Sequence, residues 1–116
     1  MFRELQSVTQ HADADGHRRW FRDGAWDLIV WYDADRAIRG FQLCHDLAGV
    51  EHAATWHRGA RLVHQRVDAG EDLPQNRTPV LVPGNVQVPT GLLAAFLARA
   101  GAIDGEIVVV VTRELA

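Results

Sequence analysis

The chain has 116 residues, 47% of them hydrophobic and 23% charged, with a formal net charge of −3. These values are typical of one globular domain and argue against a general nucleic-acid binder, which usually carries a basic excess. All twelve basic residues are arginines, a bias typical of GC-rich bacterial genomes. Mechanisms that require a lysine, such as a Schiff base or a Walker-type phosphate loop, are therefore excluded. Apolar runs such as 107–111 are too short to span a membrane, and the single cysteine and lack of a signal-peptide pattern indicate the cytoplasm.

The first two thirds of the chain read as short alternating segments between turn residues, after a polar segment at 1–16 that we expect to be an arm. The alternation predicts strands at about 18–22, 27–33, 37–45, 51–57 and 61–68. Short turns, such as the one at 33–36, join successive strands, so we expect an antiparallel meander. Gly, Pro, Asn and acidic residues fill 69–79, which predicts a loop, and 79–83 is compatible with a short edge strand.

Two helices are expected at the end of the chain. Apolar residues recur at helical spacing over 90–100, and Gly101 is a natural stop. The segment 104–115 is ambiguous, because its four consecutive valines favour a strand whereas Asp104 is a suitable N-cap for a helix. We favour the helix, since apolar residues also lie on one helical face.

The predicted fold class is therefore α+β: a strongly curved antiparallel β-meander of five or six strands, with two C-terminal helices packed on it. We expect a single domain over 1–116, with the sheet within 17–83 and a helical hairpin over 89–115. Trp31 lies in a strand that is apolar on both faces. This pattern predicts a central strand covered on both sides and a buried Trp31.

Histidines on successive predicted strands are the sharpest chemical signal. Cross-strand pairing could bring members of one set within contact distance: His45, His52, His57 and His64. Strand alternation nevertheless places Cys44 and His45 on opposite faces, as it does His52 and His57, and the chain contains no HxH or HxxxH pair. We therefore expect no metal site and no cofactor.

Catalytic constellations are not evident. Cys44, His45 and Asp46 are sequence neighbours in one strand, and a nucleophile, base and orienting acid must converge from separate segments. A buried cysteine is the simpler interpretation, and no catalytic residue is assigned.

Cations and aromatic residues alternate in the run RRWFR at 18–22. This combination is typical of single-stranded nucleic-acid binding, although arginine stems also cover aromatic neighbours on half-buried strands. Together with the histidines, these residues define a candidate binding surface: Arg19, Trp20, Arg22, Arg39, His45, Trp56, His57 and His64.

The segments RRWF, DLIVW and GFQLCHD, followed by ATWH and VDAGED, resemble a family of small uncharacterised bacterial proteins. The resemblance extends over about half of the chain, and GFQLC with a nearby DLIVW is its most specific part. It implies a conserved fold with paired C-terminal helices and no assigned function, so it assigns no catalytic residue. His45 stands where the family pattern has tyrosine, which argues against an essential role for this histidine.

We expect a non-catalytic domain that binds a small molecule or a protein partner, with a homodimer as one form. Two alternatives stay open. The first is a small enzyme with a pocket on the sheet lined by histidine and arginine. The second is a single-stranded nucleic-acid binder, against which the net charge argues. We expect no association with membranes.

Overall fold

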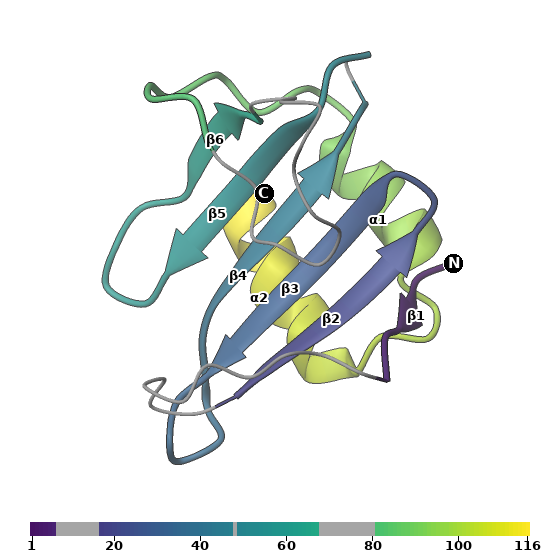
Figure 1. The fold of residues 1–116 in the computed structure, drawn as a ribbon, viewed down its shortest axis with the longest axis vertical. Helices are drawn as coiled ribbons and strands as arrows, with labels where there is room; N and C mark the ends of the chain where they lie inside the picture. Colours follow the sequence, from purple (N-terminus) through teal and green to yellow (C-terminus); the bar gives the residue numbers. More distant parts are fainter. Residues whose placement is uncertain (7–16, 48, 68–80) are drawn as a thin grey trace.

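The computed structural model describes residues 1–6, 17–47, 49–67 and 81–116. In these residues a six-stranded antiparallel sheet carries two helices on one face (Figure 1). The strands pair in the order β1-β2-β3-β4-β5-β6, so each lies beside its neighbour in sequence. Their bounds are β1 Arg3–Glu4, β2 Arg18–Asp23, β3 Trp26–Tyr32, β4 Ile38–His45, β5 His52–His57 and β6 Val63–Arg66. The predicted α+β class and curved meander are confirmed.

The turn between β3 and β4 shows why the strands follow one another as a meander. Asp33 Oδ1 accepts hydrogen bonds from the backbone N–H groups of Asp35 (2.9 Å) and Ala37 (3.0 Å). Its other carboxylate oxygen accepts a hydrogen bond from Arg58 at 2.7 Å. Arg36 has a φ of 64°, a left-handed conformation that tight turns require. The acid-rich 33–36 segment thus forms the predicted hairpin turn.

The beginning of the chain differs from the expected arm. β1 pairs with β2 through Arg3↔Arg22 and Glu4↔Phe21, and Phe2 is fully buried in the core. Two paired residues are too few for an alternating pattern to reveal a strand. The rest of that arm, 7–16, and the predicted loop at 69–79 lie outside the described residues. Within the expected edge strand at 79–83, Leu81 forms an isolated bridge with Val67.

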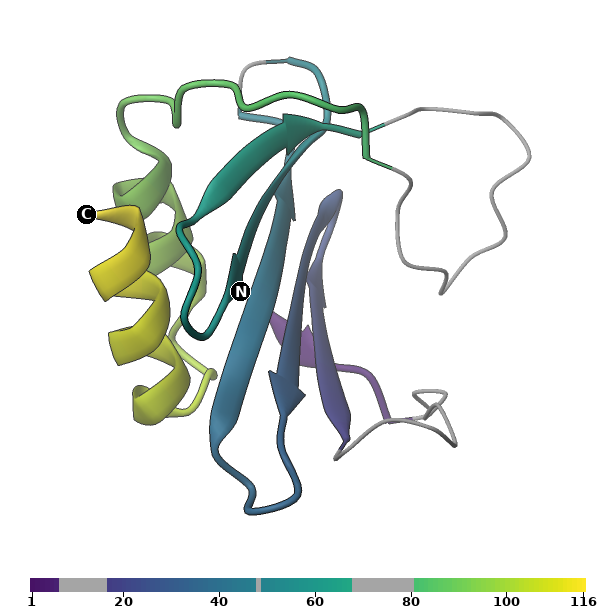
Figure 2. The same ribbon diagram turned by 90° about the vertical axis from the view of Figure 1, so that its left-hand side faces the viewer.

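The helices form a hairpin over one face of the sheet, as Figure 2 shows. Their bounds are α1 Leu92–Arg99 and α2 Gly105–Leu115. The valine-rich segment is therefore a helix, and Ile107 and Val111 are its buried contacts with the sheet. Neither helix is long and apolar enough to cross a membrane. The main core lies between these helices and the sheet and includes Phe2, Phe21, Leu28, Val30, Phe41, Leu43, Phe96, Ile107 and Val111.

The opposite side of the sheet, here the far face, carries Trp20, Ile29, Trp31, Cys44 and His57 by strand alternation. Trp20, Ile29 and Cys44 are buried, so β3 is covered on both sides as predicted. The prediction that Trp31 is buried is wrong, because its side chain is only half-buried and stacks on His57 at 5.3 Å between ring centroids. A β-bulge follows Trp31 near the end of β3, where regular pairing stops.

Candidate functional site

Three histidines from β4, β5 and β6 meet on the helix-covered face at one end of the sheet. His45 lies directly opposite His52, and His64 lies opposite Ala54, two residues further along β5. The three rings are nearly parallel, with centroid separations of 5.1 Å for His45–His64, 5.0 Å for His52–His64 and 6.1 Å for His45–His52. We call His45, His52 and His64 the histidine stack. Its geometry follows from cross-strand pairing of residues that share one face of the sheet.

A chain of hydrogen bonds determines which nitrogen carries the proton in two of the rings. The backbone N–H of Leu47 donates to His45 Nδ1 at 3.2 Å, so the proton of neutral His45 is on Nε2. His64 Nδ1 lies 3.1 Å from the carbonyl oxygen of Val86, which can only accept, so His64 carries its proton on Nδ1. The 2.9 Å contact between the two Nε2 atoms is then a hydrogen bond that His45 donates to His64. Both rings are satisfied in their neutral forms.

Burial keeps these two rings neutral. The side chains of His45 and His64 are 0% and 1% exposed. Burial, followed by the neighbouring histidines His64 and His52, lowers the pKa of His45 to about 4, and Asp46 opposes this shift only weakly. Burial likewise lowers the pKa of His64, although its bond to the carbonyl of Val86 opposes the shift. At neutral pH the pair is therefore uncharged.

A pocket of about 390 Å³ opens beside the stack. This volume falls within the range of small-molecule sites, roughly 300–1,000 Å³. The segment after Leu81 builds one wall, since it runs along β6 through hydrogen bonds from Val82 N to Arg66 O (2.9 Å) and from Val86 N to His64 O (2.6 Å). The lining residues are His52, His64, Val86, Gln87, Val88, Pro89 and Thr90.

His52 supplies the polar contact point of this pocket. Its Nδ1 lies 2.8 Å from the carbonyl oxygen of Val50 and therefore donates to it. In neutral His52, Nε2 is then an acceptor, and it has no hydrogen-bond partner among the described residues. The ring is half-buried and packs against His64. The pocket thus combines one acceptor of known tautomer with flat imidazole and aliphatic walls.

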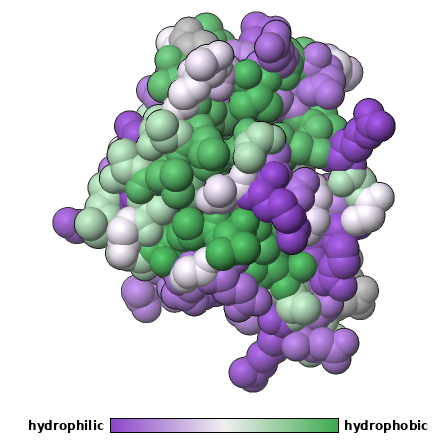
Figure 3. Space-filling model, turned by 180° about the vertical axis from the view of Figure 1, so that it is seen from behind, coloured by the Kyte–Doolittle hydropathy of each residue, from purple (hydrophilic) through white to green (hydrophobic). Residues whose placement is uncertain are grey.

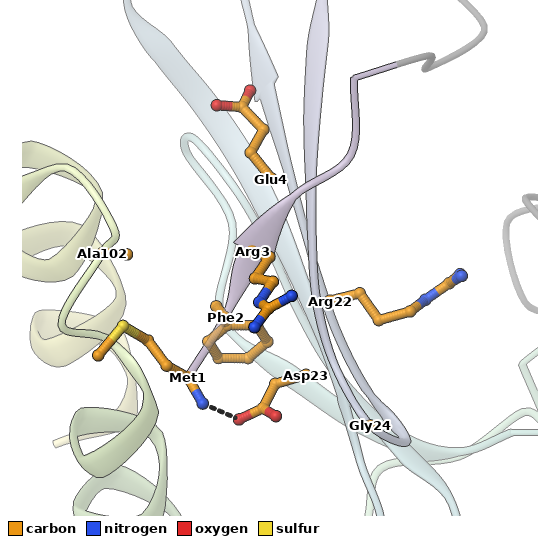
Figure 4. Close-up of a pocket in the computed structure, with 8 residues that line it drawn as sticks. All are labelled: Met1, Phe2, Arg3, Glu4, Arg22, Asp23, Gly24 and Ala102. Atoms are coloured by element: carbon orange, nitrogen blue, oxygen red, sulfur yellow. Dashed lines mark hydrogen bonds and ion pairs between the residues drawn. The ribbon is translucent and has the colours of Figure 1, made fainter.

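A second cavity, of about 550 Å³, lies beside the first strand (Figure 4). The carboxylate of Asp23 in this cavity is already paired. The amino group of Met1 lies 2.9 Å from Asp23 Oδ2, and Arg99 lies 3.5 Å from the same oxygen. Arg22 extends away from the cavity in Figure 4 and pairs with Asp27 at 2.8 Å. The acid Asp23 of this cavity is therefore already neutralised by two cations.

Of the residues predicted to form a binding surface, the structure brings His45 and His64 together. His52, which completes the stack, was named as a neighbour but not included in that surface. The sequence signal that could have added it is its position directly opposite His45 across the predicted hairpin. His57 lies on the far face against Trp31 and takes no part in the stack.

The predicted arginines and tryptophans do not share one surface. Trp20 and Arg22 lie on the far face, where each binds the carboxylate of Asp27. Arg19 lies on the helix-covered face and pairs with Glu4 (2.8 Å) and Asp104 (2.7 Å), contacts that raise the pKa of its guanidinium.

Trp56 lies on the helix-covered face, away from Trp20 and Arg22, and Arg39 lies at the β-bulge between β3 and β4. Trp56 packs against Phe41 at 6.0 Å between ring centroids. Arg39 is half-buried, and its Nε has no hydrogen-bond partner among the described residues. The predicted surface is therefore divided between the two faces of the sheet.

The histidine stack and Cys44 are the candidate groups for metal and thiol chemistry. Within the described ranges, no group of three or more His, Cys, Asp or Glu side chains is arranged to hold a metal ion. The stacked rings lie parallel instead of converging on one point, and the two Nε2 atoms face each other across a hydrogen bond. Cys44 lies on the other face from His45, and burial raises the pKa of its thiol, which makes it a poor nucleophile.

No protein family, curated protein or solved structure matches this chain. The site must therefore be interpreted from its own geometry.

Proposed function

We propose that this chain is a non-catalytic binding domain that holds a small organic molecule in the pocket beside the histidine stack. The observation that carries the proposal is that His52 lines the pocket and that its Nε2, an acceptor in the neutral ring, has no partner among the described residues. Pockets that bind small molecules combine mostly apolar walls with a few placed polar groups. Val86, Val88 and Pro89 supply such walls here.

The ring nitrogens of the stack favour binding over proton transfer. Both nitrogens of His45 and both of His64 are engaged in hydrogen bonds, so neither ring can accept a substrate proton without breaking the chain of bonds. His52 Nε2 alone is available among the three rings. It suits a ligand with one N–H or O–H donor on a planar ring, because such a ring can pack parallel to His52 and extend the stack.

We propose that the domain acts in the bacterial cytoplasm. The buried, unpaired thiol of Cys44 is compatible with a reducing compartment, which supports the bacterial cytoplasm. The resemblance to a family of small bacterial proteins supports the same setting. Nucleic-acid binding is less well supported than small-molecule binding. Neighbouring carboxylates balance the charges of Arg19, Arg22 and Arg58, which are then less available to phosphates.

A titration with two matched probes tests the proposal. Benzamide has a planar ring and an N–H donor, whereas methyl benzoate has the ring without a donor. Chemical shifts of backbone amides in ¹⁵N-labelled protein should move at His52, Val88 and Thr90 on addition of benzamide. We expect benzamide to bind more tightly than methyl benzoate by about threefold to tenfold, the value of one neutral hydrogen bond.

Two variants complete this test. His52→Phe keeps a flat ring but removes the acceptor, so it should abolish the preference for benzamide. His57→Phe changes a histidine on the far face and should preserve that preference. Shift changes confined to another part of the molecule, or a benzamide preference that survives His52→Phe, would refute the proposed site.

A further inference from the structure

We propose that this chain forms a homodimer in which α2 crosses the α2 of a second copy about a two-fold axis. The outward side of α2 carries one exposed valine between an acid and a base, here called the α2 stripe: Glu106, Val109 and Arg113. Ile107 and Val111 occupy the buried side of the helix, so the stripe points away from the sheet. Val109 is 64% exposed, more than any other large apolar side chain of the two helices.

The apolar surface continues from the stripe onto α1. The outward positions of α1 carry Ala94, Leu97 and Ala98, without a charge, and Leu97 is 44% exposed. Figure 3 shows this side of the molecule, where apolar side chains gather over much of the surface. A contiguous apolar patch bordered by charges is typical of an interaction site.

The charges of the stripe favour a second copy as the occupant. Glu106 and Arg113 are seven residues apart on the same helical face, and the midpoint between them along the helix falls beside the exposed Val109. In a two-fold contact, residue i of one copy meets residue j of the other, and j meets i. An antiparallel crossing centred beside Val109 therefore places each Glu106 opposite the partner's Arg113. The same contact buries Val109 of both copies.

The two charged groups are available for this pairing. Glu106 is exposed and takes part in no ion pair among the described residues. Arg113 is held at the helix surface by Glu114, at 2.9 Å, and its guanidinium lies 5.4 Å from the ring centroid of Trp56. Its side chain nevertheless remains 57% exposed. The pairing thus uses an acid without an intramolecular ion pair and a base whose position is already restricted.

Sedimentation velocity of the full chain over a range of about 1–200 µM tests the dimer, because a micromolar Kd shifts the monomer–dimer balance within this range. Glu106→Arg and Arg113→Glu each place like charges opposite one another. Each should raise the dimer Kd at least about tenfold. The double variant Glu106→Arg/Arg113→Glu restores opposite charges across the axis and should return the Kd to within about threefold of the original.

Arg61→Glu is the matched control, since Arg61 is an exposed arginine of the β5–β6 connection and should leave the Kd unchanged. Circular dichroism establishes that each variant is folded. A chain that stays monomeric over the whole range would overturn the homodimer and leave the patch for a different partner. A dimer whose Kd is unchanged by each single charge reversal would overturn the proposed geometry. So would a raised Kd that the double variant does not restore.

Discussion

The buried His45–His64 pair should make the protein lose stability at mildly acidic pH. The pKa of His45 is about 4 in the folded protein, against an ordinary value of 6.5. Between these values the unfolded chain binds the proton and the folded protein does not, so stability falls as the pH decreases. A shift of this size corresponds to roughly 3 kcal/mol in total, of which roughly 2 kcal/mol is lost by about pH 5. His64 contributes in the same direction because burial lowers its pKa as well.

Urea unfolding followed by tryptophan fluorescence at about pH 7.5, 6 and 5 measures this loss. His45→Gln provides the comparison, since a glutamine amide can still donate toward His64 and accept from the Leu47 N–H but does not titrate. The variant should be less stable than the original chain at neutral pH and show a flatter dependence on pH. Carboxylates with lowered pKa, such as those of Glu4 and Asp33, lose their contribution at lower pH and are common to both chains.

The difference between the two chains therefore isolates His45. Equal slopes for the original chain and for His45→Gln would refute the assignment of the acid sensitivity to this ring. A free energy of unfolding that stays constant from about pH 7.5 to about pH 5 would refute the buried neutral pair itself.

Three further perturbations have defined outcomes. Gly40→Ala should lower the free energy of unfolding in urea by about 2 kcal/mol. A Cβ there would lie 2.6 Å from the backbone oxygen of Trp56 and 3.0 Å from His57 Nδ1. An unchanged urea midpoint would show that β4 and β5 can move apart to accept the methyl group. Trp31→Ala should lower the free energy of unfolding by only about 1–2 kcal/mol, less than the loss of a fully buried tryptophan, since the ring is half-buried. A loss near 4 kcal/mol would show that the ring is covered. EDTA at about 1 mM should leave the melting temperature within about 1 °C, and a larger decrease that zinc reverses would reveal a metal.

Local patterns in the sequence were sufficient to predict most of the fold. Alternating residues and acid-rich or glycine-containing turns predict the order of β2 to β6, because each strand pairs with its sequence neighbour. The helical face of Ile107 and Val111 outweighs the strand propensity of four valines, since packing on the sheet decides the conformation. β1 could not be predicted, because its two residues are ordered by pairing with β2 and by the burial of Phe2.

The candidate site was only partly predictable. Strand alternation assigns residues within one strand to two faces. The register between neighbouring strands determines which residues of those strands share a face and touch. A register shift of one residue would separate His45 from His64. The wall formed by 86–90 depends on a long-range contact of Val86 with β6, for which the sequence carries no local signal. Trp31 is half-buried next to a β-bulge, and strand alternation alone reveals neither feature.

Ring-nitrogen NMR of the three stacked histidines at neutral pH is the most direct test of the proposed site. The structure predicts opposite tautomers for the bonded pair, with the proton on Nε2 in His45 and on Nδ1 in His64. It also predicts a proton on Nδ1 and an unprotonated Nε2 in His52. Addition of benzamide should then shift the Nε2 resonance of His52 and leave both resonances of His45 almost unchanged. A protonated Nε2 in neutral His52, or a benzamide response at His45 in place of His52, would contradict the account.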